Sequence, residues 1–169
     1  MKCLVELSHW KDVKVLQKED SGCIPTGYEW MIRYQGIECV DFDKFQEEFD
    51  LKDLNGFGSV ADKVEAKYSH VHICNKGFSN GIGKISFVRE KIGKDIPCLL
   101  ALINQQNGKF HAVPVVYIDD IKIKVIWKAV KENEQIINQI YEFSFEDIIS
   151  WHNACKGGRD IAWLEKRNN

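Results

Sequence analysis

The hydrophobic pattern of the chain changes its period after Gly93. Upstream, apolar side chains recur mostly at helical spacing, which predicts helices at residues 24–36, 41–49, 60–68 and 82–92, with a short strand at 71–74. Downstream, continuous or alternating apolar runs predict strands at 97–103, 110–118, 121–127 and 136–143. Ser59 is a possible N-cap of the helix at 60–68, and Ser144, followed three residues later by the acidic Asp147, predicts the start of a further helix. The sequence therefore predicts an α+β fold in which a helical N-terminal half packs on an antiparallel β-sheet from the C-terminal half.

Size and composition indicate one domain spanning residues 1–169. The 169 residues are 44% hydrophobic, enough to bury a core, and neither a repeat nor a proline- or serine-rich linker divides them. A net charge of −2 gives no electrostatic basis for a nucleic-acid partner. Apolar runs are too short for a membrane span, and charged residues come too early for a secretory signal, so we expect a cytoplasmic protein.

The six cysteines are widely separated and contain no C-x-x-C pair. Closely spaced ligands are typical of zinc and redox sites, so we expect neither a metal nor a cofactor. His70 and His72 alternate along a predicted strand but lack a third ligand. Cys39, Cys74 and Cys98 lie in apolar stretches and are predicted core residues.

Cys23 has a different setting, because it stands where a helix begins, two residues before Pro25. A helix N-terminus lowers the pKa of a thiol and so favours the nucleophilic thiolate. His111 opens a strand after a turn and is the best candidate for a partnering imidazole. Gln17 lies six residues before Cys23, and its side-chain amide is a candidate donor to an oxyanion.

These residues carry a resemblance. Gln17, the helix start Gly22-Cys23-Ile24-Pro25-Thr26 and the strand that begins Phe110-His111-Ala112-Val113 resemble the papain-like cysteine peptidases over about residues 10 to 130. The bacteriocin-leader (double-glycine) peptidases are the most similar branch. The resemblance implies the papain-like fold, with Cys23 as nucleophile, His111 as base, and Gln17 with the Cys23 amide as oxyanion hole. It also implies hydrolysis of a peptide or protein partner by a thiolate–imidazolium pair.

The chain departs from the family pattern at the residue that orients the histidine, which is an Asp or Asn in the family. A two-residue turn at Asp119-Asp120 would place Trp127 or Lys128 opposite His111, and neither is of that type. The third member of the triad is therefore unknown from the sequence, with Asn133 and Asp160 as more distant candidates. Ile24 is a smaller departure, since the family usually has Gly there.

Two other functions remain open at this point. A papain-like domain that has lost its activity would bind peptides in the same cleft, as the departure at the orienting position suggests. A Cys-His acyltransferase or amidase would use the same residues on another acceptor or amide. The sequence leaves the substrate and the oligomeric state open.

Overall fold

The computed structural model describes residues 4–18, 22–54, 56–103, 110–154 and 160–165. Its α-helices are α1 (Cys23–Tyr34), α2 (Phe45–Glu48), α3 (Phe57–Lys67), α4 (Gly81–Gly93) and α5 (Phe145–Ala154). Its strands are β1 (Val5–Glu6), β2 (His72–Lys76), β3 (Cys98–Ile103), β4 (Phe110–Ile118), β5 (Lys122–Glu132), β6 (Gln135–Ser144) and β7 (Ile161–Glu165). The strands form one antiparallel sheet in the order β2-β7-β3-β4-β5-β6, with β1 beside β4. The predicted mixture of helices and an antiparallel sheet is confirmed, but the division between the two halves is wrong, because β1 and β2 join the sheet from the N-terminal half and α5 lies in the C-terminal half.

Helix α1 is the buried helix that the apolar spacing predicts. Tyr28, Met31 and Ile32 are fully buried in the core. The helix ends where Gly36 adopts a left-handed conformation (φ 64°), which favours a residue without Cβ. A methyl group added at Gly27 would lie 2.5 Å from a side-chain carbon of Leu99, so this glycine allows α1 to pack closely on β3.

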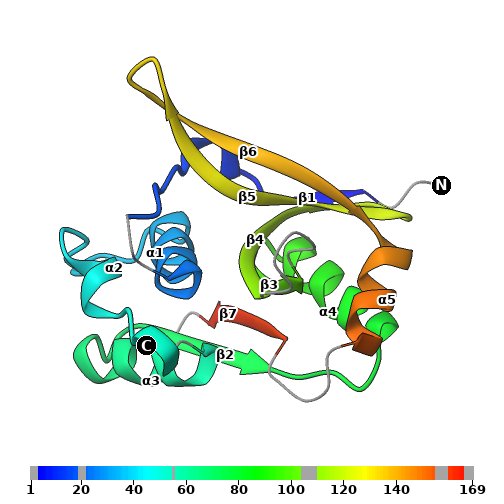
Figure 1. Ribbon diagram of the computed structural model, residues 1–169, viewed down its shortest axis with the longest axis horizontal. Helices are drawn as coiled ribbons and strands as arrows, with labels where there is room; N and C mark the ends of the chain where they lie inside the picture. The colour runs from blue at the N-terminus through cyan, green and yellow to red at the C-terminus, as the bar shows by residue number, and fades with distance from the viewer. Residues whose placement is uncertain (1–3, 19–21, 55, 104–109, 155–159, 166–169) are drawn as a thin grey trace.

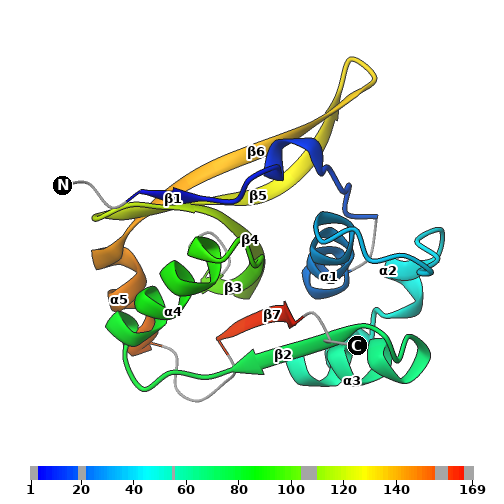
Figure 2. The same ribbon diagram turned by 180° about the vertical axis from the view of Figure 1, so that it is seen from behind.

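Strands β3 and β4 form the centre of the molecule. They pair from Cys98 with Val115 to Ile103 with Phe110. Helices α1 and α2 lie on one side of these strands, and α4 and α5 lie on the other (Figures 1 and 2). Burial on both faces explains why these strands are continuous apolar runs in the sequence. The packing of α1 on this side also brings the first residue of the helix, Cys23, against β4.

The strands on the two sides of the β3–β4 pair differ in how deeply they are buried. Strands β5 and β6 form a long hairpin whose turn, Asn133-Glu134, stands away from the rest of the molecule (Figure 1). Strand β7, the last element, inserts between β2 and β3 and pairs with both. The apolar C-terminal segment is therefore an interior strand, whereas β6 is largely half-buried or exposed.

Three predicted elements need correction. The predicted helix at 41–49 is reduced to the single turn of α2. Helix α3 begins after Gly56, so Ser59 lies inside the helix. The third predicted strand does not end at Trp127, because pairing with β6 extends β5 to Glu132. By contrast, Ser144 caps α5 as its sequence pattern predicts, accepting a hydrogen bond from the Asp147 amide.

Within the described ranges, no helix is both long and apolar enough to cross a membrane. His70 and His72 form separate hydrogen bonds, with the Glu38 carbonyl (2.8 Å) and the Glu65 carboxylate (3.0 Å). No three His, Cys, Asp or Glu side chains of the described residues come together as metal ligands. Cys98 is buried and Cys74 half-buried, but Cys39 is exposed, so the prediction of a core position is wrong for Cys39.

Candidate active site

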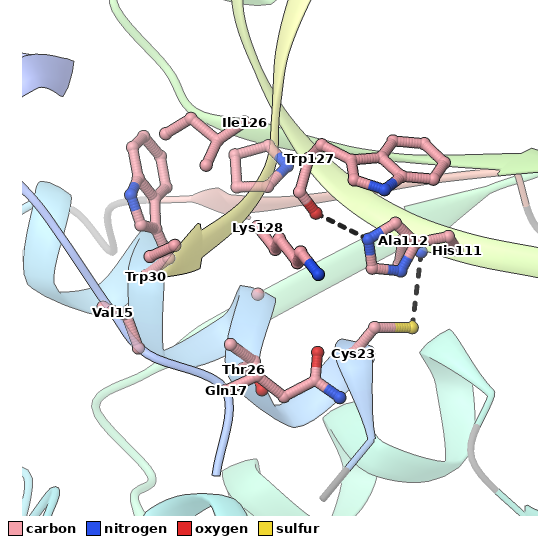
Figure 3. A pocket seen from close by; sticks show the side chains of 13 residues that line it. Val15, Gln17, Cys23, Thr26, Trp30, His111, Ala112, Ile126, Trp127 and Lys128 are labelled. Carbon is pink, nitrogen blue, oxygen red and sulfur yellow. Dashed lines mark hydrogen bonds between the residues drawn. The ribbon is translucent and has the colours of Figure 1, made fainter. Parts of the chain in front are cut away.

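Cys23, His111 and Gln17 line one pocket between the start of α1 and the outer half of the sheet (Figure 3). Cys23 is the first residue of α1 and His111 is the second residue of β4. Gln17 belongs to the segment before α1, and its carboxamide extends toward Cys23 (Figure 3). Trp30, Pro114 and Ile126 provide apolar walls. Residues separated by nearly ninety positions along the chain therefore meet because α1 packs against β4.

A hydrogen bond joins the Cys23 sulfur to the strand that carries the histidine. The Ala112 amide donates to Cys23 Sγ over 3.3 Å. Since Ala112 is the neighbour of His111, this bond holds the sulfur beside the start of β4. Figure 3 shows the sulfur and the imidazole on the same side of the pocket.

The other side of the imidazole contacts a backbone carbonyl. His111 Nε2 lies 2.6 Å from the carbonyl oxygen of Trp127. A carbonyl oxygen only accepts hydrogen bonds, so Nε2 carries a proton and Nδ1 of the neutral ring keeps its lone pair. The indole of Trp127 packs edge-on against the imidazole, with ring centroids 4.5 Å apart. One residue thus provides both the orienting acceptor and an aromatic contact.

The Trp127 carbonyl belongs to a residue that forms a β-bulge. The pairing of β5 with β6 shifts by one residue between Ile126 and Lys128, so Trp127 is the extra residue on β5. The turn before β5 is also longer than the sequence predicts, because Ile118 pairs with Ile123. The orienting group therefore lies in the predicted region, but it is the main chain of Trp127 and not a side chain.

The more distant candidates for this role lie elsewhere. Asn133 occupies the turn of the β5–β6 hairpin. Asp160 accepts a hydrogen bond from the Phe78 amide (3.0 Å) and lies 3.5 Å from Lys84 Nζ. Within the described ranges, the ring of His111 makes its hydrogen bond with Trp127 alone. Neither alternative orients the histidine in this structure.

Burial decides the resting charge of the pair. Desolvation raises the pKa of Cys23 above its ordinary value of 9.0, although the amides of Ala112, Cys23 and Ile24 lower it. Desolvation also lowers the pKa of His111 below 6.5, with the Trp127 hydrogen bond opposing it and the positive charge of Lys128 reinforcing it. The amides at the start of the helix lower the pKa of this thiol as expected, but burial outweighs them, so the expectation of a lowered pKa overall is wrong. Both groups are uncharged at neutral pH in the unliganded protein.

The sequence did not identify Gln46, which fixes the segment that carries Gln17. The buried carboxamide of Gln46 accepts from the Lys18 amide (2.7 Å) and donates to the Leu16 carbonyl (2.8 Å), the residues on either side of Gln17. Its oxygen also accepts from Thr26 Oγ1 on α1 (3.1 Å). In the sequence, Gln46 is a single polar residue next to the phenylalanines of a short predicted helix, and no motif indicates that it supports Gln17. Gln46 therefore sets the position of Gln17 relative to the start of α1.

No family model matches the chain, and no curated protein matches its sequence. The chemistry of the site therefore has to be judged from its geometry. A thiol held beside an imidazole with a free Nδ1, a backbone amide at the sulfur and a nearby carboxamide are the groups needed for nucleophilic attack on a carbonyl carbon.

Proposed function

We propose that this protein is a cysteine peptidase of papain-like type that cleaves a peptide or protein partner. The observation that carries the proposal is the pair of hydrogen bonds around the imidazole: Ala112 N–H to Cys23 Sγ on one side, and His111 Nε2–H to the Trp127 carbonyl on the other. The first bond holds the sulfur beside the start of β4, and the second leaves Nδ1 as the basic nitrogen of the imidazole. A general base needs this protonation state.

The reaction begins with attack of Cys23 Sγ on the peptide carbonyl carbon. The carbon–sulfur bond forms while the thiol proton moves to Nδ1 of His111, and the carbonyl electrons move to the oxygen. The carboxamide of Gln17 and the backbone amide of Cys23 donate to this oxyanion. When the tetrahedral intermediate collapses, the carbon–nitrogen bond breaks and Nδ1–H gives its proton to the leaving amine. Water then hydrolyses the thioester with His111 again as base.

The timing of the first proton transfer follows from burial. Because desolvation keeps both Cys23 and His111 uncharged, the thiolate–imidazolium pair forms during substrate binding or attack and is not the resting state. The Trp127 carbonyl stabilises the imidazolium as it forms, since a hydrogen bond to a charged donor is stronger than one to a neutral donor.

The same observations favour a second function if catalysis does not occur. A carbonyl oxygen carries no formal charge, so it stabilises an imidazolium less than an aspartate would, and the buried thiol is not activated at rest. The alternative is thus a catalytically impaired papain-like domain that binds peptides in this pocket. An acyltransferase would use the same residues but transfer the acyl group to an acceptor other than water, and an amidase would release the amine of a different amide.

A proteome-derived peptide mixture tests these functions together. The purified protein is incubated with the mixture, and new peptide termini are identified by mass spectrometry. We expect cleavage that is lost in Cys23→Ala and falls by about 10²–10⁴-fold in His111→Ala. Cys39→Ala removes an exposed thiol outside the pocket and is the matched control, with cleavage unchanged.

The remaining outcomes separate the alternatives. Retention of peptides without new termini would contradict the peptidase and support the binding domain. Peptides that gain an added amine, or lose only a side-chain amide, would indicate the acyltransferase or the amidase. Cleavage that persists in Cys23→Ala would exclude this site as its source.

A further inference from the structure

The pocket contains one permanently charged side chain among the described residues that line it. This residue is Lys128, which directly follows Trp127 on β5. Its ammonium group extends into the pocket, on the side where His111 and Gln17 lie (Figure 3). The other described lining residues are apolar or are neutral polar groups at neutral pH.

Lys128 differs from two other lysines of the same strand, Lys122 and Lys124, in having no carboxylate partner among the described residues. Lys122 and Lys124 both pair with Glu142 across the β5–β6 hairpin, at 3.4 and 3.8 Å. Among the described residues, no carboxylate lies within ion-pair distance of Lys128. Its positive charge acts instead on His111, where it disfavours the protonated imidazole. The pocket therefore presents an ammonium group without a counter-ion in the described part of the chain.

We infer that Lys128 binds a carboxylate of the substrate close to the carbonyl that Cys23 attacks. This inference rests on the proposed peptidase function and specifies its substrate class, a peptide with a negative charge beside the cleaved bond. Lys128 is exposed, but the apolar walls of the pocket keep solvent from one side of an anion bound beside its ammonium group, and this strengthens the attraction relative to the open surface.

Binding of the carboxylate has a consequence for the catalytic pair. The negative charge offsets the field of Lys128 at His111, so the imidazole accepts the Cys23 proton more readily when the substrate is present. An acidic substrate thus promotes formation of the thiolate–imidazolium pair that burial disfavours at rest. Lys128 therefore lowers the basicity of His111 in the unliganded protein, and it binds the acidic substrate that raises this basicity again.

Two alkylating reagents of nearly equal size test the charge preference without turnover. Iodoacetate carries a carboxylate and iodoacetamide is neutral, and both alkylate a thiolate. The labelling rates of Cys23 with the two reagents are measured at mildly alkaline pH by mass spectrometry. The exposed Cys39 in the same molecule gives the intrinsic ratio of the reagents. We define the preference as the iodoacetate-to-iodoacetamide rate ratio at Cys23 divided by the ratio at Cys39.

We expect this preference to fall about fivefold in Lys128→Gln, as for the loss of one partly solvated charge interaction at short range. It falls further in Lys128→Glu and decreases with added salt. Lys131→Gln is the matched control, because Lys131 is an exposed lysine of β5 like Lys128 but does not line the pocket. An unchanged preference in Lys128→Gln would overturn the inference and leave the peptidase proposal intact. Failure of both reagents to reach Cys23 would overturn both proposals, since a substrate carbonyl must approach the same sulfur.

Peptides identify the source of the carboxylate. One pair of peptide mixtures has either Glu or Gln fixed next to each cleavable bond. A second pair ends in either a free C-terminal carboxylate or an amide. A preference for Glu that is lost in Lys128→Gln indicates an acidic side chain. A preference for the free carboxylate that is lost in the same variant indicates a chain terminus. Cleavage without either preference would overturn the inference.

Discussion

His111 Nε2 lies 2.6 Å from the carbonyl oxygen of Trp127, so a main-chain group orients the imidazole where the sequence shows no suitable side chain. The position of this oxygen depends on the bulge at Trp127 and on the pairing of β4, β5 and β6. Main-chain carbonyls carry no sequence signature. The relationship has direct consequences for the protonation and chemistry of the site.

The first prediction concerns the tautomer of His111. Because the Trp127 carbonyl only accepts, neutral His111 carries its proton on Nε2 and not on Nδ1. Nitrogen NMR of protein labelled in its histidine rings distinguishes the two tautomers, and His111→Gln assigns the signal by its loss. A proton on Nδ1 at mildly alkaline pH would contradict both the hydrogen bond and the role of Nδ1 as base.

The second prediction concerns stability at acidic pH. Desolvation lowers the pKa of folded His111 below the value of 6.5 that applies to the unfolded chain. Between the two values the unfolded state binds more protons, so His111 makes the free energy of unfolding increase with pH in this range. Above the unfolded pKa the histidine is neutral in both states and its contribution no longer changes.

Urea unfolding between about pH 5 and about pH 8 measures this contribution. As the pH falls below 6.5, wild type is expected to lose free energy of unfolding relative to His111→Gln. At the alkaline end the difference is constant and provides the internal control. If wild type instead became more stable relative to His111→Gln in acid, the pKa of folded His111 would have to be raised.

The third prediction concerns Cys23 in the unliganded protein. Desolvation raises the pKa of its thiol above 9.0, so the thiolate forms only in alkaline solution. The ultraviolet absorbance of the thiolate is titrated in wild type and Cys23→Ser, and the difference is assigned to Cys23. A thiolate already present at neutral pH would show that the resting site contains an ion pair.

The fourth prediction concerns Gln46 as a positioning residue. Replacement by Ala removes the hydrogen bonds to the Leu16 carbonyl and the Lys18 amide, so Gln17 loses its fixed position. We expect kcat to fall by about tenfold or more with a smaller change in KM, because the oxyanion forms only in the reaction.

Gln35→Ala is the matched control for Gln46→Ala. Gln35 follows the C-terminal end of α1 and donates to the Leu164 carbonyl (3.2 Å), outside the described lining of the pocket. Both variants lose a hydrogen bond at a partly or fully buried glutamine and are destabilised, but only Gln46→Ala should lose kcat at a temperature where both are folded. Equal losses of kcat would indicate that Gln46 acts on stability alone.

The fifth prediction concerns the contact of α1 with β3. A methyl group at Gly27 would lie 2.5 Å from a side-chain carbon of the buried Leu99, so Gly27→Ala forces one element to move. We expect the free energy of unfolding to fall by about 1–3 kcal/mol, despite the higher helix propensity of alanine. Gly93→Ala, with no atom within 4 Å of the added methyl, is the control and should be neutral or stabilising. Equal effects would mean that the Leu99 side chain yields without cost.

The sequence by itself determined the local elements and the residue types of the candidate site. Periodicity located α1 with Cys23 at its start and strand β4 with His111 near its start, because burial of a helix face or a strand imposes a local spacing. Capping chemistry located the start of α5 at Ser144 for the same reason, since it involves residues three positions apart.

Tertiary structure alone decided the contacts between distant residues and the charge of the site. The insertion of β7 between β2 and β3, the Trp127 carbonyl at His111 and the support of Gln17 by Gln46 depend on pairing and packing over long separations. The pKa of Cys23 is raised, contrary to the sequence-based expectation, because desolvation depends on how many groups surround the sulfur. A helix start is visible in the sequence, but the depth at which it is buried is set by the assembled fold.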